Sequence, residues 1–293
     1  MTTDNTGKFT GLGEVYARSR PGYPTELLDL LAARMGGVEA AAAERIEAAP
    51  ASADSTGADS TAADTTAAEV PEAGRAGAPV VADIGAGTGK LTAELLSRGW
   101  NVSAVEPNDD MRDALVARLA DDERLTVVGA PAEATTLADA AVDLVTVAQA
   151  FHWFDIPSFR AECRRILRPG GQVALIWNFR RRSEASVQAV AEAFRARVGG
   201  FVALTLGEEI TDEDLEEFYG GPHFQRFAFD NDEEIGWETF RERHLSTSYA
   251  PKEGDPAREP LIADLERIFH EYAVDGRYTF PNSTHVLLGE LTD

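Results

Sequence analysis

The sequence contains one cysteine, Cys163, among 293 residues. A single thiol forms neither an intrachain disulfide nor a multi-cysteine zinc site, and we expect Cys163 to belong to the core. No run of about 18 apolar residues occurs, which excludes a transmembrane helix. The first residues, Met1 to Lys8, are polar and lack the apolar core of a secretory signal. We therefore expect a cytoplasmic protein with no membrane partner.

Basic residues are scarce, because 27 Lys and Arg stand against 50 Asp and Glu, and the formal net charge is −23. Nucleic acids and anionic membranes attract cationic surfaces, so neither is an expected partner. Seven acids within Glu208–Glu217 indicate either a cation site or a solvated helix start or loop. Seven arginines and one glutamate between Arg160 and Arg182 could receive an anionic ligand or balance the acidic C-terminal part.

Residues 38–79 lack aromatic side chains and nearly lack large aliphatic ones. Such a segment cannot bury enough apolar area to offset the entropy lost on ordering, so we expect a disordered insertion. The chain then divides into an N-terminal lid segment with a first helix (1–37), a central core (80–182) and a C-terminal lid with closing strands (183–293).

Apolar runs and turn residues predict alternating strands and helices. A helix begins near Pro24 and ends before Gly36. Strands are predicted over residues 80–84, 102–105, 125–128, 142–147 and 172–177, and helices over 90–98, 109–120 and 155–167, with Asn108 and Asp155 as N-caps. This alternation indicates an α/β fold with a doubly wound, mostly parallel sheet, in which ligands bind at the carboxyl ends of the strands.

The first predicted strand leads into a glycine-rich turn, in which Asp83 is followed by Gly85, Ala86, Gly87 and Gly89. Glycines allow a tight turn and a close approach of backbone to a ligand. The spacing G-x-G-x-G fits neither the dinucleotide fingerprint nor a phosphate-binding P-loop. A tight turn without a ligand is the alternative interpretation.

The second predicted strand ends at Glu106, 23 residues after Asp83. A carboxylate at this point of the fold can accept hydrogen bonds from both hydroxyls of a ribose, as in dinucleotide sites. Together with the glycine turn, it predicts a nucleoside-bearing ligand without a pyrophosphate at the glycine loop.

Four segments resemble the successive motifs of class I S-adenosylmethionine-dependent methyltransferases: VADIGAGTGKLT, AVEPNDDM, GAPAEATTL and DLVTVAQAFHWFD. The segments VYARSRPGYP and HWFD are similar to a small-molecule branch that includes trans-aconitate methyltransferase-like enzymes. The tail, WETFRERHLSTSYAP and GRYTFPNSTHVLLGEL, resembles that branch more loosely, with Asn282 where tyrosine is usual. The resemblance implies S-adenosyl-L-methionine as the cofactor, a Rossmann-like cofactor-binding core over residues 80–182 and a substrate lid over 183–293.

The resemblance also implies roles for individual residues. The glycine loop would lie against the aminocarboxypropyl group with Asp83 beneath it, Glu106 would hold the ribose, and Gln149 would line the methionine portion. Nearer the adenine would lie Asn108, Met111, Ala132 and Glu133. The residues that this interpretation assigns to cofactor binding are Tyr16, Arg20, Asp83, Gly85, Ala86, Gly87, Gly89, Glu106, Asn108, Met111, Ala132, Glu133 and Gln149.

Two of these residues, Tyr16 and Arg20, precede the first helix in a segment expected to close over the cofactor. Arg20 could pair with a carboxylate of cofactor or substrate, or lie in solvent. His152 and Trp153 are the catalytic candidates, because they follow the fourth strand, where an acceptor could sit. His152 could be a base or bind a substrate carboxylate, and Trp153 could face the sulfonium; alternatively, these rings pack under the lid.

The sequence thus predicts a methyltransferase that acts on a carboxylate or hydroxyl oxygen of a small molecule, mainly by positioning it, and that binds no metal. Two alternatives remain open: methylation of a protein, and a non-catalytic cofactor-binding module. The acceptor and the oligomeric state do not follow from the sequence.

Overall fold

The computed structural model describes residues 21–36, 44–45, 77–199, 210–247 and 249–293. Tyr16, Arg20 and most of the predicted insertion 38–79 lie outside these ranges. None of the helices within them is long and apolar enough to cross a lipid bilayer.

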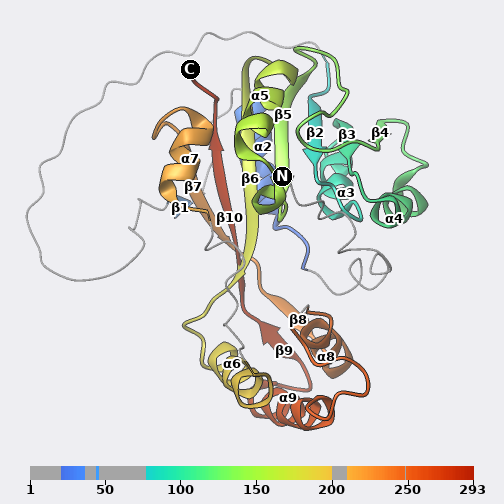
Figure 1. Cartoon of the computed structure of the whole chain (residues 1–293), viewed down its shortest axis with the longest axis vertical. Helices are drawn as coiled ribbons and strands as arrows, with labels where there is room; N and C mark the ends of the chain where they lie inside the picture. Colours follow the sequence, from blue (N-terminus) through green and yellow to red (C-terminus); the bar gives the residue numbers. More distant parts are fainter. Residues whose placement is uncertain (1–20, 37–43, 46–76, 200–209, 248) are drawn as a thin grey trace, which may run out of the picture.

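The fold is built on an eight-stranded sheet with the strand order β1-β7-β10-β6-β5-β2-β3-β4 (Figure 1). Its parallel part consists of β2 (Val80–Ile84), β3 (Asn101–Val105), β4 (Leu125–Val128), β5 (Val142–Ala148) and β6 (Leu167–Arg180). The chain winds outward from β2 to β4 and then returns to β5 on the other side of β2. This reversal confirms the predicted doubly wound fold and places a ligand crevice at the carboxyl ends of β2 and β5.

An antiparallel extension completes the sheet. β10 (Asn282–Gly289) pairs with both β6 and β7 (Gln225–Asp230), so residues from the C-terminal part belong to the main sheet. The edge strand β1 (Glu44–Arg45) pairs with β7. Two residues of the segment 38–79, which was predicted to be a disordered insertion, thus pair with the sheet.

Helices cover both faces of the sheet. One face packs against α2 (Thr25–Gly36) and α3 (Lys90–Ser97), through leucines such as Leu27, Leu31 and Leu95. The other face packs against α5 (Ile156–Ile166) and α7 (Asp212–Tyr219), where Phe151 and Phe159 are fully buried. α4 (Asp109–Leu119) connects β3 to β4, and the single-turn helix η2 (Phe151–Trp153) follows β5.

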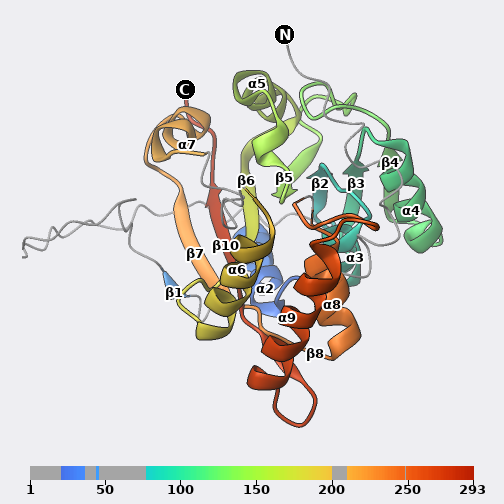
Figure 2. The same cartoon turned by 60° about the horizontal axis from the view of Figure 1, so that its bottom comes forward.

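The lid forms a separate hydrophobic cluster below the carboxyl end of β6 (Figure 1), and it comes forward in Figure 2. It consists of α6 (Ala185–Arg197), β8 (Glu233–Ile235), α8 (Trp237–Leu245), α9 (Arg258–Tyr272) and β9 (Tyr278–Phe280). β8 and β9 form a two-stranded sheet. Within the segment 183–293, predicted to hold a lid and closing strands, α7, β7 and β10 pack with the core.

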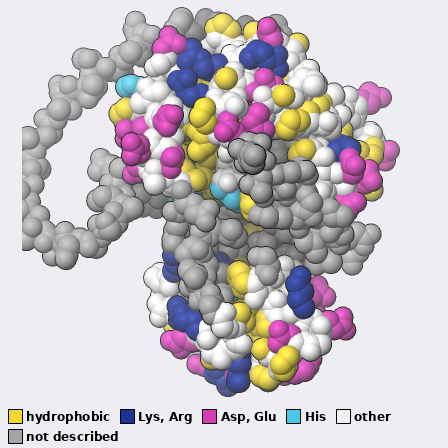
Figure 3. Space-filling view, in the orientation of Figure 1, with side chains coloured by type: hydrophobic (Ala, Val, Ile, Leu, Met, Phe, Trp, Pro, Cys, Tyr) yellow, Lys and Arg dark blue, Asp and Glu magenta, His cyan; other side chains and the backbone are white. Residues whose placement is uncertain are grey.

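The two charged segments have mainly structural roles. Among the described acids of Glu208–Glu217, Asp212 and Asp214 lie in the first turn of α7, where Asp214 forms a capping box with Thr211. This geometry is the solvated helix start, stabilised by acids near the helix N-terminus. Several arginines of the basic segment have protein partners: Arg165 pairs with Glu162, Arg168 with Asp143 and Arg181 with Asp232. Basic and acidic side chains accordingly lie side by side near α5 (Figure 3).

Candidate functional site

The turn from β2 to α3 is fixed by the neighbouring strand. The N–H groups of Gly85 and Ala86 both donate to the carbonyl oxygen of Val105, at 2.9 and 3.1 Å. Gly85 has φ +69° and a Cβ there would lie 2.6 Å from the Cβ of Ala150, so only glycine fits. Gly87 has φ +55°, but a Cβ there would meet no described atom within 4 Å. Within the part of the chain that the structure describes, the turn is therefore packed at Gly85 and open at Gly87.

Gly89 has a different environment from Gly87. It is the N-cap of α3 with φ +76°, and a Cβ there would lie 2.8 Å from Leu115 of α4. Close packing of two helices accounts for this glycine, so its assignment to cofactor binding stays a prediction.

The Glu106 carboxylate closes the site at the end of β3. Its Oε2 accepts the N–H of Gly87 and its Oε1 accepts the N–H of Asn108, each at 2.9 Å. Burial raises the pKa of Glu106, while these two N–H groups and the Arg112 guanidinium act in the opposite direction. Each oxygen keeps a second lone pair for a ligand hydroxyl. Backbone donors thus hold the carboxylate in one orientation before any ligand binds.

Asp83 lies beneath the turn and faces the protein interior. Its oxygens accept from Thr92 Oγ1 at 2.6 Å and Thr146 Oγ1 at 3.0 Å. Burial raises the pKa of Asp83 to about 6, with a smaller contribution from Glu106 and an opposing one from the two threonines. The structure therefore shows Asp83 as a residue that ties β2 to α3 and β5, and its contact with a cofactor ammonium stays a prediction.

The predicted adenine residues lie on two segments beside Glu106. Asn108 caps α4 as predicted, because its Oδ1 accepts the N–H of Met111 at 3.0 Å. The Met111 side chain is buried. After β4, Ala132 is buried, and Glu133 Oε1 accepts the N–H of Asp155 at 2.9 Å. These residues border the end of β3 from the β4 side.

The catalytic candidates follow β5. Gln149 has φ +60°, a strained value for a residue with a side chain, and its Nε2 donates to the carbonyl oxygen of Asn178 at 3.3 Å. His152 and Trp153 lie in η2 with their ring centroids 4.7 Å apart. His152 is half-buried and Trp153 is 37% exposed, whereas the neighbouring Phe151 is fully buried. Phe151 is therefore the core residue of this turn, and Trp153 is open to solvent.

A polar network that the sequence did not reveal anchors the chain before α2. Asn178 Nδ2 and Asn231 Nδ2 donate to the carbonyl oxygen of Gly22 at 3.1 and 3.0 Å, and Thr284 Oγ1 donates to Asn178 Oδ1 at 2.6 Å. The four residues come from four different parts of the sequence. No motif within any one segment marks these residues, because their hydrogen-bond partners are far away in the sequence.

Comparisons with known proteins show which family this chain belongs to. The family model described as a methyltransferase domain matches residues 82–175. An uncharacterized methyltransferase of Schizosaccharomyces pombe is 30% identical over 189 residues, which cover 64% of this chain and 72% of that protein. An uncharacterized methyltransferase of Mycobacterium tuberculosis is 48% identical over 105 residues, 36% of this chain. This match spans 42% of the mycobacterial protein, less than half its length.

A candidate type II methyltransferase from Anaeromyxobacter dehalogenans has the same overall fold. Its TM-score is 0.54 at 20% identity, over 93% of this chain and 98% of that one. The fold is thus a Rossmann-like methyltransferase fold. The chain belongs to the methyltransferase family.

Proposed function

We propose that this protein is an S-adenosylmethionine-dependent methyltransferase that methylates a carboxylate or hydroxyl oxygen of a small molecule. The arrangement of Glu106 and Gly87 carries the proposal. Two backbone N–H groups fix the Glu106 carboxylate beside Gly87, where an added Cβ would meet no atom of the described residues within 4 Å. A carboxylate so held suits the two hydroxyls of a ribose, and the open glycine suits an aminocarboxypropyl chain in place of a pyrophosphate.

The chain would act mainly by positioning its ligands. The cofactor, when bound, supplies a sulfonium methyl group whose S–C bond breaks as the bond to the acceptor oxygen forms. Glu106 and the glycine turn would hold the nucleoside end, and Gln149 would border the methionine portion. A carboxylate acceptor is already an anion and needs no base, whereas a hydroxyl acceptor would transfer its proton to His152. Trp153 would face the sulfonium as an aromatic ring beside a cation.

The lid supports a small acceptor. Its cluster lies beyond the carboxyl end of β6, at the same end of the sheet as the carboxyl ends of β2 and β5 (Figure 1). A lid that closes from that end would exclude water from a small substrate. The nearer resemblance to trans-aconitate methyltransferase-like enzymes, with their small-molecule acceptors, stays a prediction.

Calorimetry with S-adenosylmethionine tests the first half of the proposal, and a screen of carboxylic and phenolic metabolites with S-adenosylhomocysteine release as the readout tests the second. We expect saturable binding and turnover with one acceptor class. Absence of cofactor binding would refute the proposal. Radiolabel that enters only protein bands would replace the acceptor by a protein, and binding without turnover across the panel would indicate a non-catalytic module.

A further inference from the structure

The loop between β4 and β5 (residues 129–141) is attached to α5 near both ends of that helix. At the start of α5, Glu133 accepts the N–H of Asp155. At its end, the N–H of Ala140 donates to the Arg165 carbonyl oxygen at 2.9 Å, and that of Ala141 to the Ile166 carbonyl oxygen at 2.8 Å. The loop therefore takes its shape from the helix beside it.

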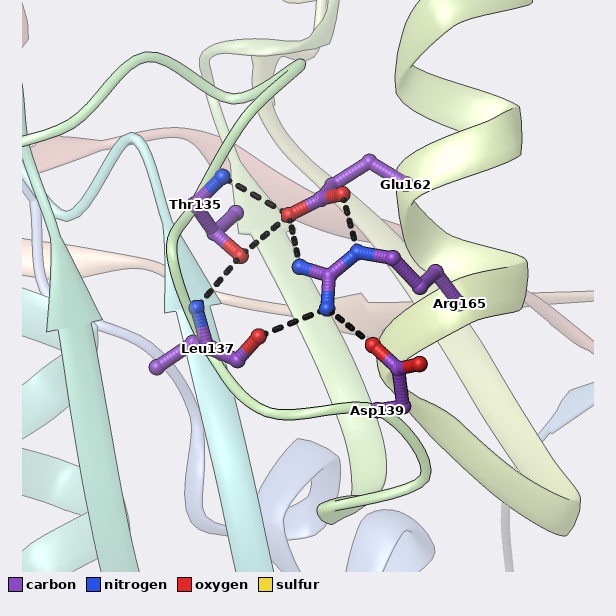
Figure 4. Close-up of polar contacts among 5 residues, drawn as sticks. All are labelled: Thr135, Leu137, Asp139, Glu162 and Arg165. Atoms are coloured by element: carbon purple, nitrogen blue, oxygen red, sulfur yellow. Dashed lines mark hydrogen bonds and ion pairs between the residues drawn. The ribbon is translucent and has the colours of Figure 1, made fainter.

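Between these attachments, the side chains of Glu162 and Arg165 bind the middle of the loop (Figure 4). Glu162 Oε1 accepts from both N and Oγ1 of Thr135, at 2.7 and 2.5 Å. Arg165 donates to both Glu162 oxygens, at 2.7 and 2.8 Å, and to the carbonyl oxygen of Leu137 at 2.7 Å. It also pairs with Asp139 at 2.6 Å. One buried carboxylate and one guanidinium thus bind four polar groups of a single loop: the N–H and hydroxyl of Thr135, the carbonyl of Leu137 and the carboxylate of Asp139.

The loop needs such external support. Thr136 and Ala140 have φ +62° and +48°, values that residues with a Cβ adopt at a cost. Glu162 is only 7% exposed, and its burial acts to raise its pKa. The Arg165 guanidinium and the two Thr135 donors outweigh burial, so that the pKa of Glu162 is lowered and the side chain is an anion at neutral pH. The ion pair is therefore intact under ordinary conditions.

The same loop begins next to the proposed nucleoside site. The N–H of Glu106 donates to the carbonyl oxygen of Val128, the last residue of β4, at 3.0 Å. The chain that leaves β4 thus starts beside the carboxylate proposed to bind the ribose, on the side away from the glycine turn. Ala132 and Glu133, the residues predicted to lie near the adenine, belong to this loop.

We propose that Glu162 and Arg165 are positioning residues for the nucleoside half of the cofactor, because they hold residues 131–135 in the binding conformation before the ligand arrives. This inference rests on the proposed function. A loop that is already ordered loses less conformational entropy when the ligand binds. Loss of the contacts made by Glu162 and Arg165 should therefore raise the Kd for the cofactor rather than slow the methyl transfer itself.

The test uses the variant Arg165→Gln, with Arg168→Gln as its matched control. Arg168 pairs with the buried Asp143 at 2.9 Å, and the two arginine side chains have similar exposed fractions, 35% and 38%. Asp143 lies at the amino end of β5, away from the proposed site. We expect Arg165→Gln to raise the Kd for S-adenosylmethionine about tenfold with kcat at saturating cofactor within about twofold of wild type. For Arg168→Gln, Kd should change less than about twofold even if both variants melt at similarly reduced temperatures.

A second pair of variants avoids the loss of a charge. Thr135→Val keeps the volume but removes the hydroxyl that binds Glu162, and should raise Kd about threefold, whereas Thr135→Ser should restore it. Equal Kd changes for Arg165→Gln and Arg168→Gln, or an unchanged Kd for both Arg165→Gln and Thr135→Val, would refute the positioning role while leaving the proposed function intact. A wild-type protein that binds no S-adenosylmethionine would overturn the proposed function, and this inference with it.

Discussion

Glu106 accepts the backbone N–H of Gly87 at 2.9 Å, across the carboxyl ends of two neighbouring parallel strands. The contact links the residue proposed to bind the ribose with the open point of the glycine turn. Because β2 and β3 are in parallel register, from Val80 opposite Asn101 to Ile84 opposite Val105, the two loops that follow them must meet. The carboxylate is thereby positioned by the sheet itself.

We predict that Glu106→Ala raises the Kd for S-adenosylmethionine about 100-fold, because hydrogen bonds to a charged group contribute roughly 1.5–3 kcal/mol. Calorimetry measures this change, and a thermal melt reports whether the fold is retained. Glu123→Ala is the control, since Glu123 is exposed in the turn before β4. A Kd within threefold of wild type for Glu106→Ala would remove Glu106 from the binding site.

Asp83 predicts a pH dependence of stability. Its pKa in the folded protein is about 6, above the ordinary value of 3.8, so the folded state holds this proton to a higher pH than the unfolded chain. The wild type therefore loses stability as the pH rises from about 4 to about 6, by on the order of 3 kcal/mol. Asp83→Asn cannot ionise. Its free energy of unfolding relative to wild type should increase across this window, as urea denaturation at pH 4.5 and pH 7 can measure, and a pH-independent difference would contradict the prediction.

His152 can be tested separately from cofactor binding. We expect His152→Ala to lower kcat/KM for the acceptor at least about tenfold while the Kd for S-adenosylmethionine stays within about twofold. His223→Ala is a suitable control, because His223 is exposed beyond the far end of α7. Unchanged kinetics would assign His152 to packing.

The lid contains a buried histidine, His244, whose pKa is lowered by burial, whereas burial raises the pKa of Asp83. His244 Nδ1 lies 2.8 Å from the Phe240 carbonyl oxygen, and its ring packs among Phe240 and Phe280. Burial, with Arg180 and Arg243 nearby, holds its pKa well below 6.5. Because the unfolded chain takes up this proton more readily, the lid should lose stability as the pH falls below about 6.5.

Hydrogen exchange of residues 237–245, corrected for the intrinsic effect of pH, measures this loss. Protection should decrease between pH 7 and pH 5 in the wild type and much less in His244→Phe, which keeps an aromatic ring without a titrating group. Equal pH dependence in both proteins would show that another group controls the lid.

The succession of strands and helices in the parallel core could be predicted, because apolar runs, turn residues and helix caps act within a few residues. The predicted strand 125–128 matches β4 residue for residue, and Asn108 and Asp155 cap α4 and α5 as their positions before those helices predict. The glycine turn and Glu106 follow from the same rule, since the carboxyl ends of parallel strands meet at one edge. Cys163 is buried in the core, as expected.

The remaining features depend on contacts between distant parts of the chain. Asn231 and Gly22 are 209 residues apart, and Thr135 and Glu162 are 27 apart, yet each pair forms a hydrogen bond. Side-chain spacing within a segment contains no information about such partners. The pairing partners of the closing strands and the contacts of Glu162 and Arg165 with the β4–β5 loop were therefore not predicted. The sequence by itself determined the doubly wound core and the place of its binding crevice, because hydrophobic period and turn residues act over a few positions. Only the tertiary structure decided which side chains meet across that crevice, because burial and long-range pairing orient them.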